Sequence, residues 1–314
     1  MMEPLPLVSL IIATYNHKKF VSETVAGALS QDYPNLEIVI SDDCSPDGTF
    51  ETLQGLTHGY SGPHALTVRK NDRNLGLVPH VNKLLLEFAH GEYVMLSGGD
   101  DVCLSQTVSL AIEGIKKFGV DSIAFNMYTI DAESRKTGLY FEGKTDGVEV
   151  YTLADYVKGD YKTSGACRMF KRDIFTQFGP FAGDCQTEDT PNLLRTFIYG
   201  KVGFCYVPNI CYRIHERNIS GFNSLMLNID PRKVYKQYGR DLELAFDKEM
   251  LSKSEYETVH QFHHVCLLEK IARRQVYMEN GKIFRVLCAL AYIFKRGYSL
   301  SCVKSLLKFA LNLE

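Results

Sequence analysis

The chain has 314 residues, of which 45% are hydrophobic and 23% charged, with a formal net charge of −2. This composition is typical of a globular protein with a buried core, and the charge gives no sign of nucleic-acid binding. The 9 cysteines are irregularly spaced, which argues against a disulfide framework and favours a reducing, cytoplasmic compartment. No signal peptide is expected, and no apolar run reaches the roughly 20 residues that span a bilayer.

The first hundred residues alternate between strand-like and helix-like patterns. Short apolar runs predict four strands, at 8–13, 37–41, 66–70 and 93–97. The amphipathic segments that follow them predict helices, and Gly119 is expected to end the fourth helix. This alternation predicts an α/β fold, with an open and mostly parallel sheet covered by helices on both faces.

The pattern changes after residue 122. Further elements are expected as strands at 122–128 and 202–207, a hairpin-like excursion at 139–150 and a helix at 190–199. After residue 230 the chain is predicted to be helical, and Ser254 and Glu257 are expected to form a capping box. We therefore expect a catalytic domain at 1–225 and a helical C-terminal extension at 226–314.

Three polar clusters each follow a predicted strand. They are Thr14-Tyr15-Asn16, Asp42-Asp43 and Asp100-Asp101. Ligands of open α/β sheets bind outside the carboxyl ends of the strands. The three clusters are therefore expected to line one edge of the sheet and to mark a binding site.

The pair Asp42-Asp43 has two interpretations. An Asp-Asp pair after a strand is often only a loop or a helix cap. Here Ser45 and Asp47 are expected to cap the next helix, which begins at Pro46, so that Asp42 stays free for a ligand. A carboxylate of this kind can accept a hydrogen bond from the imide or amino group of a nucleotide base.

The segment Gly98-Gly99-Asp100-Asp101 ends the fourth predicted strand. Its glycines allow a sharp turn and the close approach of an anion, and its carboxylates are hard oxygen ligands suited to Mg²⁺ or Mn²⁺. Such a cation would neutralise the charge of a leaving diphosphate. The alternative is a Gly-Asp turn in which Asp101 caps the next helix.

Two later segments carry further candidates. Glu188 and Asp189 precede a predicted helix, where acidic residues often only favour the helix dipole. One of them can instead act as a general base that takes a proton from an acceptor hydroxyl. His215 follows a strand-like stretch and becomes a metal ligand only if it faces Asp100.

In this order, the motifs resemble those of glycosyltransferase family 2, inverting enzymes with the GT-A fold. The similarity covers roughly residues 7–221. The matching segments are Val8–Asn16, Glu37–Asp47, Asn74-Leu75-Gly76, Gly91–Asp101, Gly179-Pro180-Phe181, Glu188-Asp189 and Tyr212-Arg213-Ile214-His215. The resemblance implies an open mixed sheet flanked by helices, with a C-terminal helical extension.

The resemblance also implies roles for single residues. Asp100 and His215 would hold Mn²⁺ or Mg²⁺, and Asp189 would be the catalytic base, with Glu188 as its less favoured substitute. Thr14 and Tyr15 would contact the nucleoside. The remaining donor-binding residues would be Asn16, Asp42, Asp43 and Asp101, of which Asp42 would bind the base.

Two positions depart from the family pattern. Gly98 stands where the first aspartate of an Asp-x-Asp motif is usual, and Val81 stands where an arginine often follows the Asn-x-Gly motif. The first departure leaves Asp100 as the main acidic ligand. The second implies that a phosphate contact is missing or is made by another residue.

These expectations describe an inverting glycosyltransferase. It would move a sugar from a nucleotide diphosphate donor, with UDP favoured, to an acceptor hydroxyl during assembly of a cell-surface polysaccharide or lipid-linked glycan. A non-catalytic nucleotide-sugar-binding protein is one alternative, which Gly98 favours. A sugar-1-phosphate nucleotidyltransferase is disfavoured, because the first strand is not followed by a glycine-rich phosphate loop.

The C-terminal segment is basic. Residues 270–314 contain nine Lys or Arg and two Glu, and Ser299 is expected to cap an amphipathic helix. Basic amphipathic helices bind anionic membrane surfaces, although packing on the catalytic domain would explain the pattern equally well. The first interpretation predicts peripheral contact with the inner face of the plasma membrane and a lipid-linked acceptor.

Overall fold

The computed structural model describes residues 4–216, 218 and 221–278. The chain divides into two compact units, Met1–His215 and Glu216–Glu314. Within the described residues, no helix combines the length and apolar character needed to cross a membrane. The domain boundary expected near residue 225 stays a prediction.

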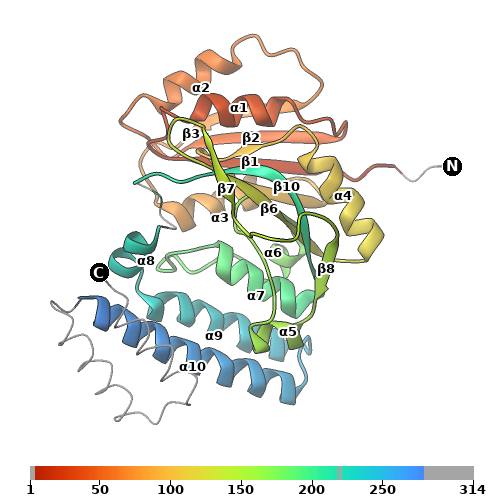
Figure 1. Cartoon of the computed structure of the whole chain (residues 1–314), viewed down its shortest axis with the longest axis vertical. Coiled ribbons are helices and arrows are strands. Elements are labelled where there is room, and N and C mark those ends of the chain that lie inside the picture. Colours follow the sequence, from red (N-terminus) through yellow and green to blue (C-terminus); the bar gives the residue numbers. More distant parts are fainter. Residues whose placement is uncertain (1–3, 217, 219–220, 279–314) are drawn as a thin grey trace. The chain divides into compact units, whose positions relative to one another are not determined.

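The first unit is built on a ten-stranded mixed sheet, shown in Figure 1. Its path runs β3-β2-β1-β4-β9-β6-β10-β5, while β7 pairs with β6 and β8 pairs with β10. The strands are β1 Val8–Thr14, β2 Leu36–Asp42, β3 Ala65–Lys70, β4 Tyr93–Gly98, β5 Val102–Cys103, β6 Ser122–Ile130, β7 Lys136–Leu139, β8 Val148–Tyr151, β9 Arg168–Lys171 and β10 Val202–Arg213. The expected fold class, an open mixed α/β sheet flanked by helices, is confirmed.

Helices cover both faces of this sheet (Figure 1). Residues of α1, α2 and α4 belong to one buried cluster, and residues of α3 and α6 to another. The helices of the first unit are α1 Val21–Leu29, α2 Thr49–Thr57, α3 Leu77–Glu87, α4 Thr107–Phe118, α5 Leu153–Lys158, α6 Arg172–Phe178 and α7 Asp189–Tyr199. The helix α4 ends at Gly119 in a left-handed conformation with φ 60°, as predicted.

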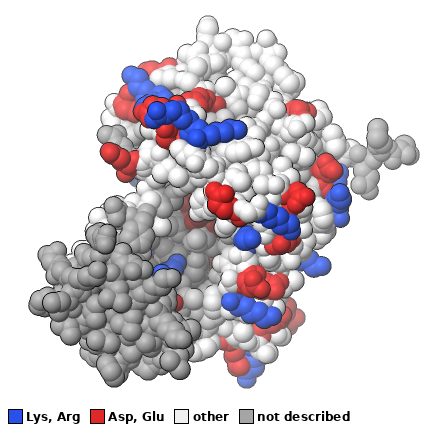
Figure 2. Space-filling model, viewed as in Figure 1, with Lys and Arg blue, Asp and Glu red and all other residues white. Residues whose placement is uncertain are grey.

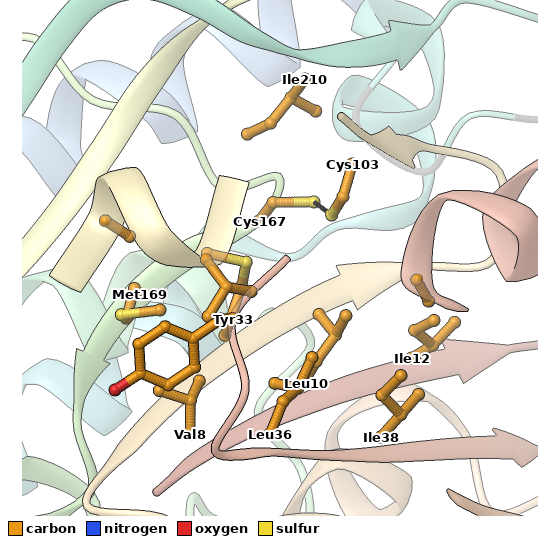
Figure 3. Packing of buried hydrophobic residues seen from close by; sticks show 14 of the residues in the cluster. Val8, Leu10, Ile12, Tyr33, Leu36, Ile38, Cys103, Cys167, Met169 and Ile210 are labelled. Carbon is orange, nitrogen blue, oxygen red and sulfur yellow. Dashed lines mark hydrogen bonds between the residues drawn. The ribbon is translucent and has the colours of Figure 1, made fainter. Parts of the chain in front are cut away.

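The two buried clusters explain the apolar run that opens the chain. Successive side chains of a strand point to opposite faces of its sheet. Leu10 and Ile12 accordingly pack in the first cluster, shown in Figure 3, whereas Ile11 packs in the second. The first cluster also contains Cys103 and Cys167, whose sulfur atoms lie 3.2 Å apart (Figure 3). Strand β1 is therefore buried on both faces.

Strand register brings the ends of β1, β2 and β4 together. Thr14 at the end of β1 pairs with Asp42 at the end of β2, and Ala13 pairs with Gly98 at the end of β4. Both pairings are parallel. The loops that leave these strands therefore emerge at the same edge of the sheet, as the sequence predicted.

Several local expectations were wrong. Segment 139–150 is not a hairpin, because β7 pairs with β6 and β8 pairs with β10. The helix expected from Pro46 begins at Thr49, with Gly48 as its N-cap. Strand β9, which was not predicted, runs antiparallel between β4 and β6.

The second unit is helical in its described part. Its helices are α8 Phe222–Asn228, α9 Pro231–Asp247 and α10 Lys253–Met278. The predicted capping box lies two residues earlier than expected, because Ser252 and Glu255 exchange the hydrogen bonds. In the pairing of α9 with α10, the ring of Tyr238 packs 4.6 Å from that of His263. The basic helix expected around Ser299 lies outside the described residues.

Charged side chains of both signs are interspersed on the face that Figure 2 shows. Surface ion pairs of the first unit join Lys19 to Glu133 at 3.1 Å and Arg135 to Asp131 at 2.8 Å. Exposed pairs of this kind add little stability. This pattern agrees with the nearly balanced net charge of the chain.

Candidate functional site

The candidate site begins where β1 meets β2. The Thr14 hydroxyl, which is buried, donates to the Asp42 carboxylate at 3.2 Å. Asn16 follows with a left-handed backbone, φ 59°, and its amide donates to the Ser45 hydroxyl at 2.9 Å. Tyr15, which lies between them, is 42% exposed. The turn after β1 is thus tied to the loop after β2, and its aromatic ring is left accessible.

Asp42 is more constrained than the sequence indicated. Its carboxylate is fully buried and accepts hydrogen bonds from the Ser45 amide at 2.8 Å and the Ser45 hydroxyl at 2.5 Å. The expectation that Ser45 caps the next helix and leaves Asp42 without a partner is therefore wrong. Asp47, which precedes the N-cap Gly48, does accept from the Thr49 amide at the start of α2, at 2.9 Å. Recognition of a base by Asp42 stays a prediction.

Asp43 holds the loop that contains the Asn-x-Gly motif. One carboxylate oxygen accepts from the Asn71 side chain at 2.7 Å and the Leu75 amide at 2.9 Å. The other accepts from the Gly76 amide at 2.9 Å. Asp43 is 2% exposed, and protein donors surround both of its oxygens. In this structure it shapes the site by fixing a loop.

Asp100 lies between two imidazole rings at the end of β4. Its Oδ2 atom is 3.1 Å from His215 Nε2 and 3.9 Å from His17 Nε2. The ring of His215 packs 4.7 Å from that of Phe20. Burial alone would raise the pKa of Asp100, but the hydrogen bond with His215 and the nearby His17 outweigh it and lower the pKa below its usual value. The carboxylate is therefore held in its charged form.

A buried arginine supports the main chain of this loop. The Arg213 side chain is 0% exposed, and its Nε atom donates to the Asp100 carbonyl at 2.9 Å. Its other nitrogens donate to the Asp131 carbonyl at 3.1 Å, the Ser134 hydroxyl at 2.8 Å and Glu23 at 3.2 Å. Arg213 thereby ties the β4 loop to α1 and to the turn after β6.

Asp101 faces the protein interior. Its carboxylate accepts from the Arg213 amide at 2.9 Å. Burial and then the charge of Asp100 raise the pKa of Asp101 well above its usual value. The alternative role as a helix cap is wrong, because α4 begins at Thr107 with Gln106 as its N-cap.

The residues present suit a divalent cation in part. Asp100 and His215 offer a hard carboxylate oxygen and an imidazole nitrogen, the ligand types that Mn²⁺ accepts. The described residues contain no group of three or more His, Cys, Asp or Glu side chains arranged to hold a metal ion. A cation at Asp100 would therefore need ligands from a bound molecule or water, as Mg²⁺ commonly does.

The acidic residues of α7 are held near the end of β4 by strand β9. Arg168, the first residue of β9, pairs with Leu96 in β4. The guanidinium of Arg168 is buried and donates to the Asp189 carbonyl at 2.5 Å. Burial and then the charge of Asp189 raise the pKa of Glu188 to about 7. Two neighbouring acidic residues thus stand at the start of α7, and burial makes Glu188 a weaker acid than an exposed glutamate.

Replacement of Glu188 by glutamine tests this environment. The raised pKa means that, between about pH 4.5 and about pH 7, the folded state holds a proton that the unfolded state loses. The contribution of the protonated Glu188 to the free energy of unfolding is present at low pH and is lost as the pH rises through that window. We therefore expect the difference in melting temperature between Glu188→Gln and the native protein to be more positive at pH 8 than at pH 5. Each kcal/mol by which the native protein loses unfolding free energy over this range should raise the difference by about 2–4 °C.

Differential scanning calorimetry at both pH values would measure this change. Glu51→Gln on α2 is the matched control, because its side chain is 66% exposed. A relative melting temperature of Glu188→Gln that stays constant between pH 5 and pH 8 would contradict the prediction.

Sequence reasoning missed three residues of this site. His17 follows the polar cluster after β1, so its neighbours already indicated its position. Arg213 was visible as part of a motif, but its contact with the Asp100 carbonyl depends on the pairing of β10 with β6 and β5. Arg168 had no local signal, because its role depends on the unpredicted strand β9.

A model of the family described as Glycosyl transferase family 2 matches residues 9–179. The curated relative WfaP of Escherichia coli is a UDP-Glc:alpha-D-GlcNAc-diphosphoundecaprenol beta-1,3-glucosyltransferase; it is 31% identical over 134 residues, covering 43% of this chain and 51% of WfaP. The chain spans between 23% and 65% of the length of the curated relatives that it matches here.

Two solved structures share the fold. Staphylococcus aureus TarS 1-349, in complex with UDP-GlcNAc, gives a TM-score of 0.58 at 17% identity and covers 96% of this chain and 90% of its own. The mannosyltransferase PcManGT from Pyrobaculum calidifontis, in complex with GDP-Man and Mn²⁺, gives 0.56 at 16% identity, with 97% and 86% covered. The family model spans more than half of the sequence, and the chain belongs to glycosyl transferase family 2.

Proposed function

We propose that this glycosyltransferase is an inverting, metal-dependent enzyme that transfers a sugar from a UDP-linked donor to an acceptor hydroxyl. The observation that carries the proposal is the position of Asp100, which faces His215 at 3.1 Å where β4 ends. The carboxyl groups of Glu188 and Asp189 begin a helix that Arg168 ties to the neighbouring strand. The UDP-GlcNAc complex of TarS and the GDP-Man and Mn²⁺ complex of PcManGT support a nucleotide diphosphate donor.

Asp100 and His215 would hold Mn²⁺ or Mg²⁺ together with oxygens of the donor. When bound, such a cation supplies positive charge that stabilises a leaving diphosphate. The lowered pKa of Asp100 keeps its carboxylate ionised at neutral pH, so that it can hold a cation without first losing a proton. Tyr15, exposed beside this loop, would contact the nucleoside, while Thr14 and Asn16 shape the turn that carries it.

Asp189 would act as the general base. Its carboxylate would take the proton from the acceptor hydroxyl while the acceptor oxygen attacks the anomeric carbon from the side opposite the diphosphate, which inverts the configuration. Arg168 holds the main chain of Asp189, and therefore limits how far the carboxylate moves. Glu188, with a pKa of about 7, would be partly protonated at neutral pH and is the second candidate.

We further propose that the acceptor is a glycan, either lipid-linked or part of a cell-surface polysaccharide. The diphosphoundecaprenol-linked acceptor in the printed name of WfaP supports this class. The protein would then work in the cytoplasm at the inner face of the plasma membrane. The basic segment 270–314 would supply the peripheral contact, through residues that lie mostly outside the described part of the chain.

A thermal-shift screen of UDP-, GDP- and TDP-sugars with and without Mn²⁺ tests the donor. We expect a UDP-sugar to raise the melting temperature in a manner that depends on Mn²⁺. NMR of the glycoside product would then report the configuration at the anomeric carbon. Stabilisation by a nucleotide sugar without any hydrolysis or transfer would instead support the non-catalytic alternative.

The glycine that replaces a family aspartate has a role of its own. A Cβ atom at Gly98 would lie 2.6 Å from Asp100 Oδ1, so any side chain there displaces the carboxylate. We expect Gly98→Ala to lower the transfer rate about tenfold while changing the free energy of unfolding by less than about 1 kcal/mol, because only a side chain must move. Initial rates and urea unfolding would measure both.

Gly99→Ala is the matched variant. Its Cβ atom would lie 2.6 Å from both His17 Nδ1 and Thr14 Cγ2, in the tightly packed turn after β1. Overpacking of this kind costs about 1–3 kcal/mol, so we expect a clear loss of stability. Equal stability losses for Gly98→Ala and Gly99→Ala would contradict this assignment.

A further inference from the structure

His17 lies beside Asp100, with its Nε2 atom 3.9 Å from Asp100 Oδ2. Its amide donates to the Thr49 hydroxyl at 3.0 Å. Its carbonyl accepts from the amides of Phe20 and Val21, both at 2.9 Å, at the start of α1. The main chain of His17 is thus fixed by α1 and by the N-terminus of α2. The Cα position from which the His17 ring extends toward Asp100 is therefore set by both helices.

One face of the site leaves buried polar atoms without protein partners. His17 Nδ1 and Asn16 Oδ1 are both buried, and neither makes a hydrogen bond. The Nδ1 edge is confined, because a Cβ atom on Gly99 would lie 2.6 Å from it. The His17 side chain is 21% exposed, so the ring retains a solvent-accessible part. Because the Nδ1 edge is enclosed by the turn, a ligand can reach the ring only from its Nε2 side.

The position of the ring determines which nitrogen carries the proton. Nε2 lies 3.9 Å from Asp100 Oδ2. A lone pair on Nε2 would face this carboxylate and be repelled, whereas an N–H would be attracted. Without a cation on Asp100, the neutral imidazole therefore favours the proton on Nε2, and an anionic oxygen bound beside Asp100 would favour the same tautomer. A distance of 3.9 Å is too long for a hydrogen bond, so the carboxylate does not satisfy this donor.

This arrangement distinguishes His17 from a metal ligand. A histidine that binds a metal through one nitrogen almost always donates the N–H of the other nitrogen to an acceptor. His17 Nδ1 has no such acceptor. The described residues likewise form no three-ligand metal group around Asp100. His17 is therefore suited to donate a hydrogen bond to an anionic oxygen that binds beside Asp100.

We propose that His17 Nε2–H donates to a diphosphate oxygen of the nucleotide sugar. This inference rests on the proposed function, because it requires a nucleotide diphosphate whose oxygens approach Asp100. The turn after β1 would then supply a phosphate contact. In the family, an arginine is often found at the position of Val81. Val81 itself is 1% exposed and packs in the core, so it makes no contact with a ligand.

Isothermal titration calorimetry with UDP, GDP or TDP, whichever binds the native protein, and with the matching nucleoside would test this inference. We expect His17→Ala to weaken binding of the nucleoside diphosphate about tenfold, the loss of one hydrogen bond to a charged group. Binding of the nucleoside should change less than twofold. His17→Gln should retain part of the affinity, because its side-chain amide carries a donor at nearly the same reach.

His90→Ala is the control, because His90 is 67% exposed and pairs with Glu37 at 3.1 Å, before β4 begins. It should bind the nucleoside diphosphate as the native protein does. Manganese alone, followed by electron paramagnetic resonance, should bind His17→Ala and the native protein equally. If His17→Ala does not fold, the comparison of His17→Gln with His90→Ala decides the question.

The possible failures are distinct. If the native protein binds none of the three nucleoside diphosphates, the proposed function itself is wrong. If the native protein binds one of them and both His17 variants bind it as tightly as the native protein does, only the role of His17 is wrong. An equal loss of manganese and nucleotide affinity in His17→Ala would make His17 a metal ligand and overturn the hydrogen-bond assignment.

Discussion

Replacement of Asp100 by asparagine is expected to lower the transfer rate by a factor of about 10³ or more, because preorganised charge at a leaving group is among the largest contributions to catalysis. The substitution keeps the shape of the side chain but removes the charge that faces His215 at 3.1 Å. A neutral amide oxygen is a poor ligand for a divalent cation beside a diphosphate. Initial rates over a range of Mn²⁺ concentrations would measure the loss.

Stability provides the control for this variant. The substitution retains the Asp100 carbonyl that accepts from Arg213, but it removes the attraction between the charged carboxylate and His215, so the unfolding midpoint in urea should fall only modestly. Glu51→Gln, which removes an exposed carboxylate from α2, should transfer sugar at the native rate. A variant Asp100→Asn with the native rate and the native Mn²⁺ dependence would refute the metal site.

Replacement of Asp189 by asparagine is expected to have the second-largest effect. The amide cannot accept the acceptor's proton, and loss of a general base costs about 10²–10⁴ in rate. The nucleotide site should be unaffected, because Asp189 contacts Arg168 through its carbonyl, which the substitution retains. We therefore expect kcat to fall while the dissociation constant of the donor remains unchanged. Single-turnover rates and calorimetric donor binding would measure the two quantities separately.

The neighbouring residue provides the comparison for Asp189. Glu188→Gln should reduce kcat less than Asp189→Asn does. The opposite ranking would make Glu188 the base, a role for which its pKa of about 7 is suited at neutral pH. The control is urea unfolding: both variants must unfold at the same urea concentration as the native protein for their rates to be compared.

The parts of the fold that follow local rules could be predicted. The apolar run at 8–13 corresponds to β1, and the alternation of strands and helices gave the order of the first four parallel elements. Because parallel strands end at one edge of a sheet, the adjacency of the Thr14 and Asp42 segments followed from this order. The helix end at Gly119 was equally local, since a left-handed C-cap favours glycine.

The parts that depend on long-range pairing could not be predicted. Strand β9 is only four residues long and lies between β4 and β6, which precede it by about 40 to 80 positions. Nothing in its own sequence shows which strands it joins. The contact between Arg168 and the Asp189 carbonyl depends on this pairing, and with it the position of the predicted base.

Side-chain hydrogen bonding was the second limit. Ser45 followed by Pro46 is a favourable helix start, but Ser45 donates to Asp42 and accepts from Asn16 instead. The competition between a cap and a buried carboxylate depends on desolvation, which a sequence pattern does not report.

Asp100 both anchors the β4 loop and presents a carboxylate, and it uses different atoms for the two. The guanidinium of Arg213 meets the carbonyl of residue 100, so the loop is braced through its peptide group. If the guanidinium of Arg213 paired with the carboxylate of Asp100 instead, it would compete with a metal ion for that negative charge. Because Arg213 braces the loop through the peptide group, a cation that binds the Asp100 carboxylate would displace the His215 contact but would need no rearrangement of the buried arginine.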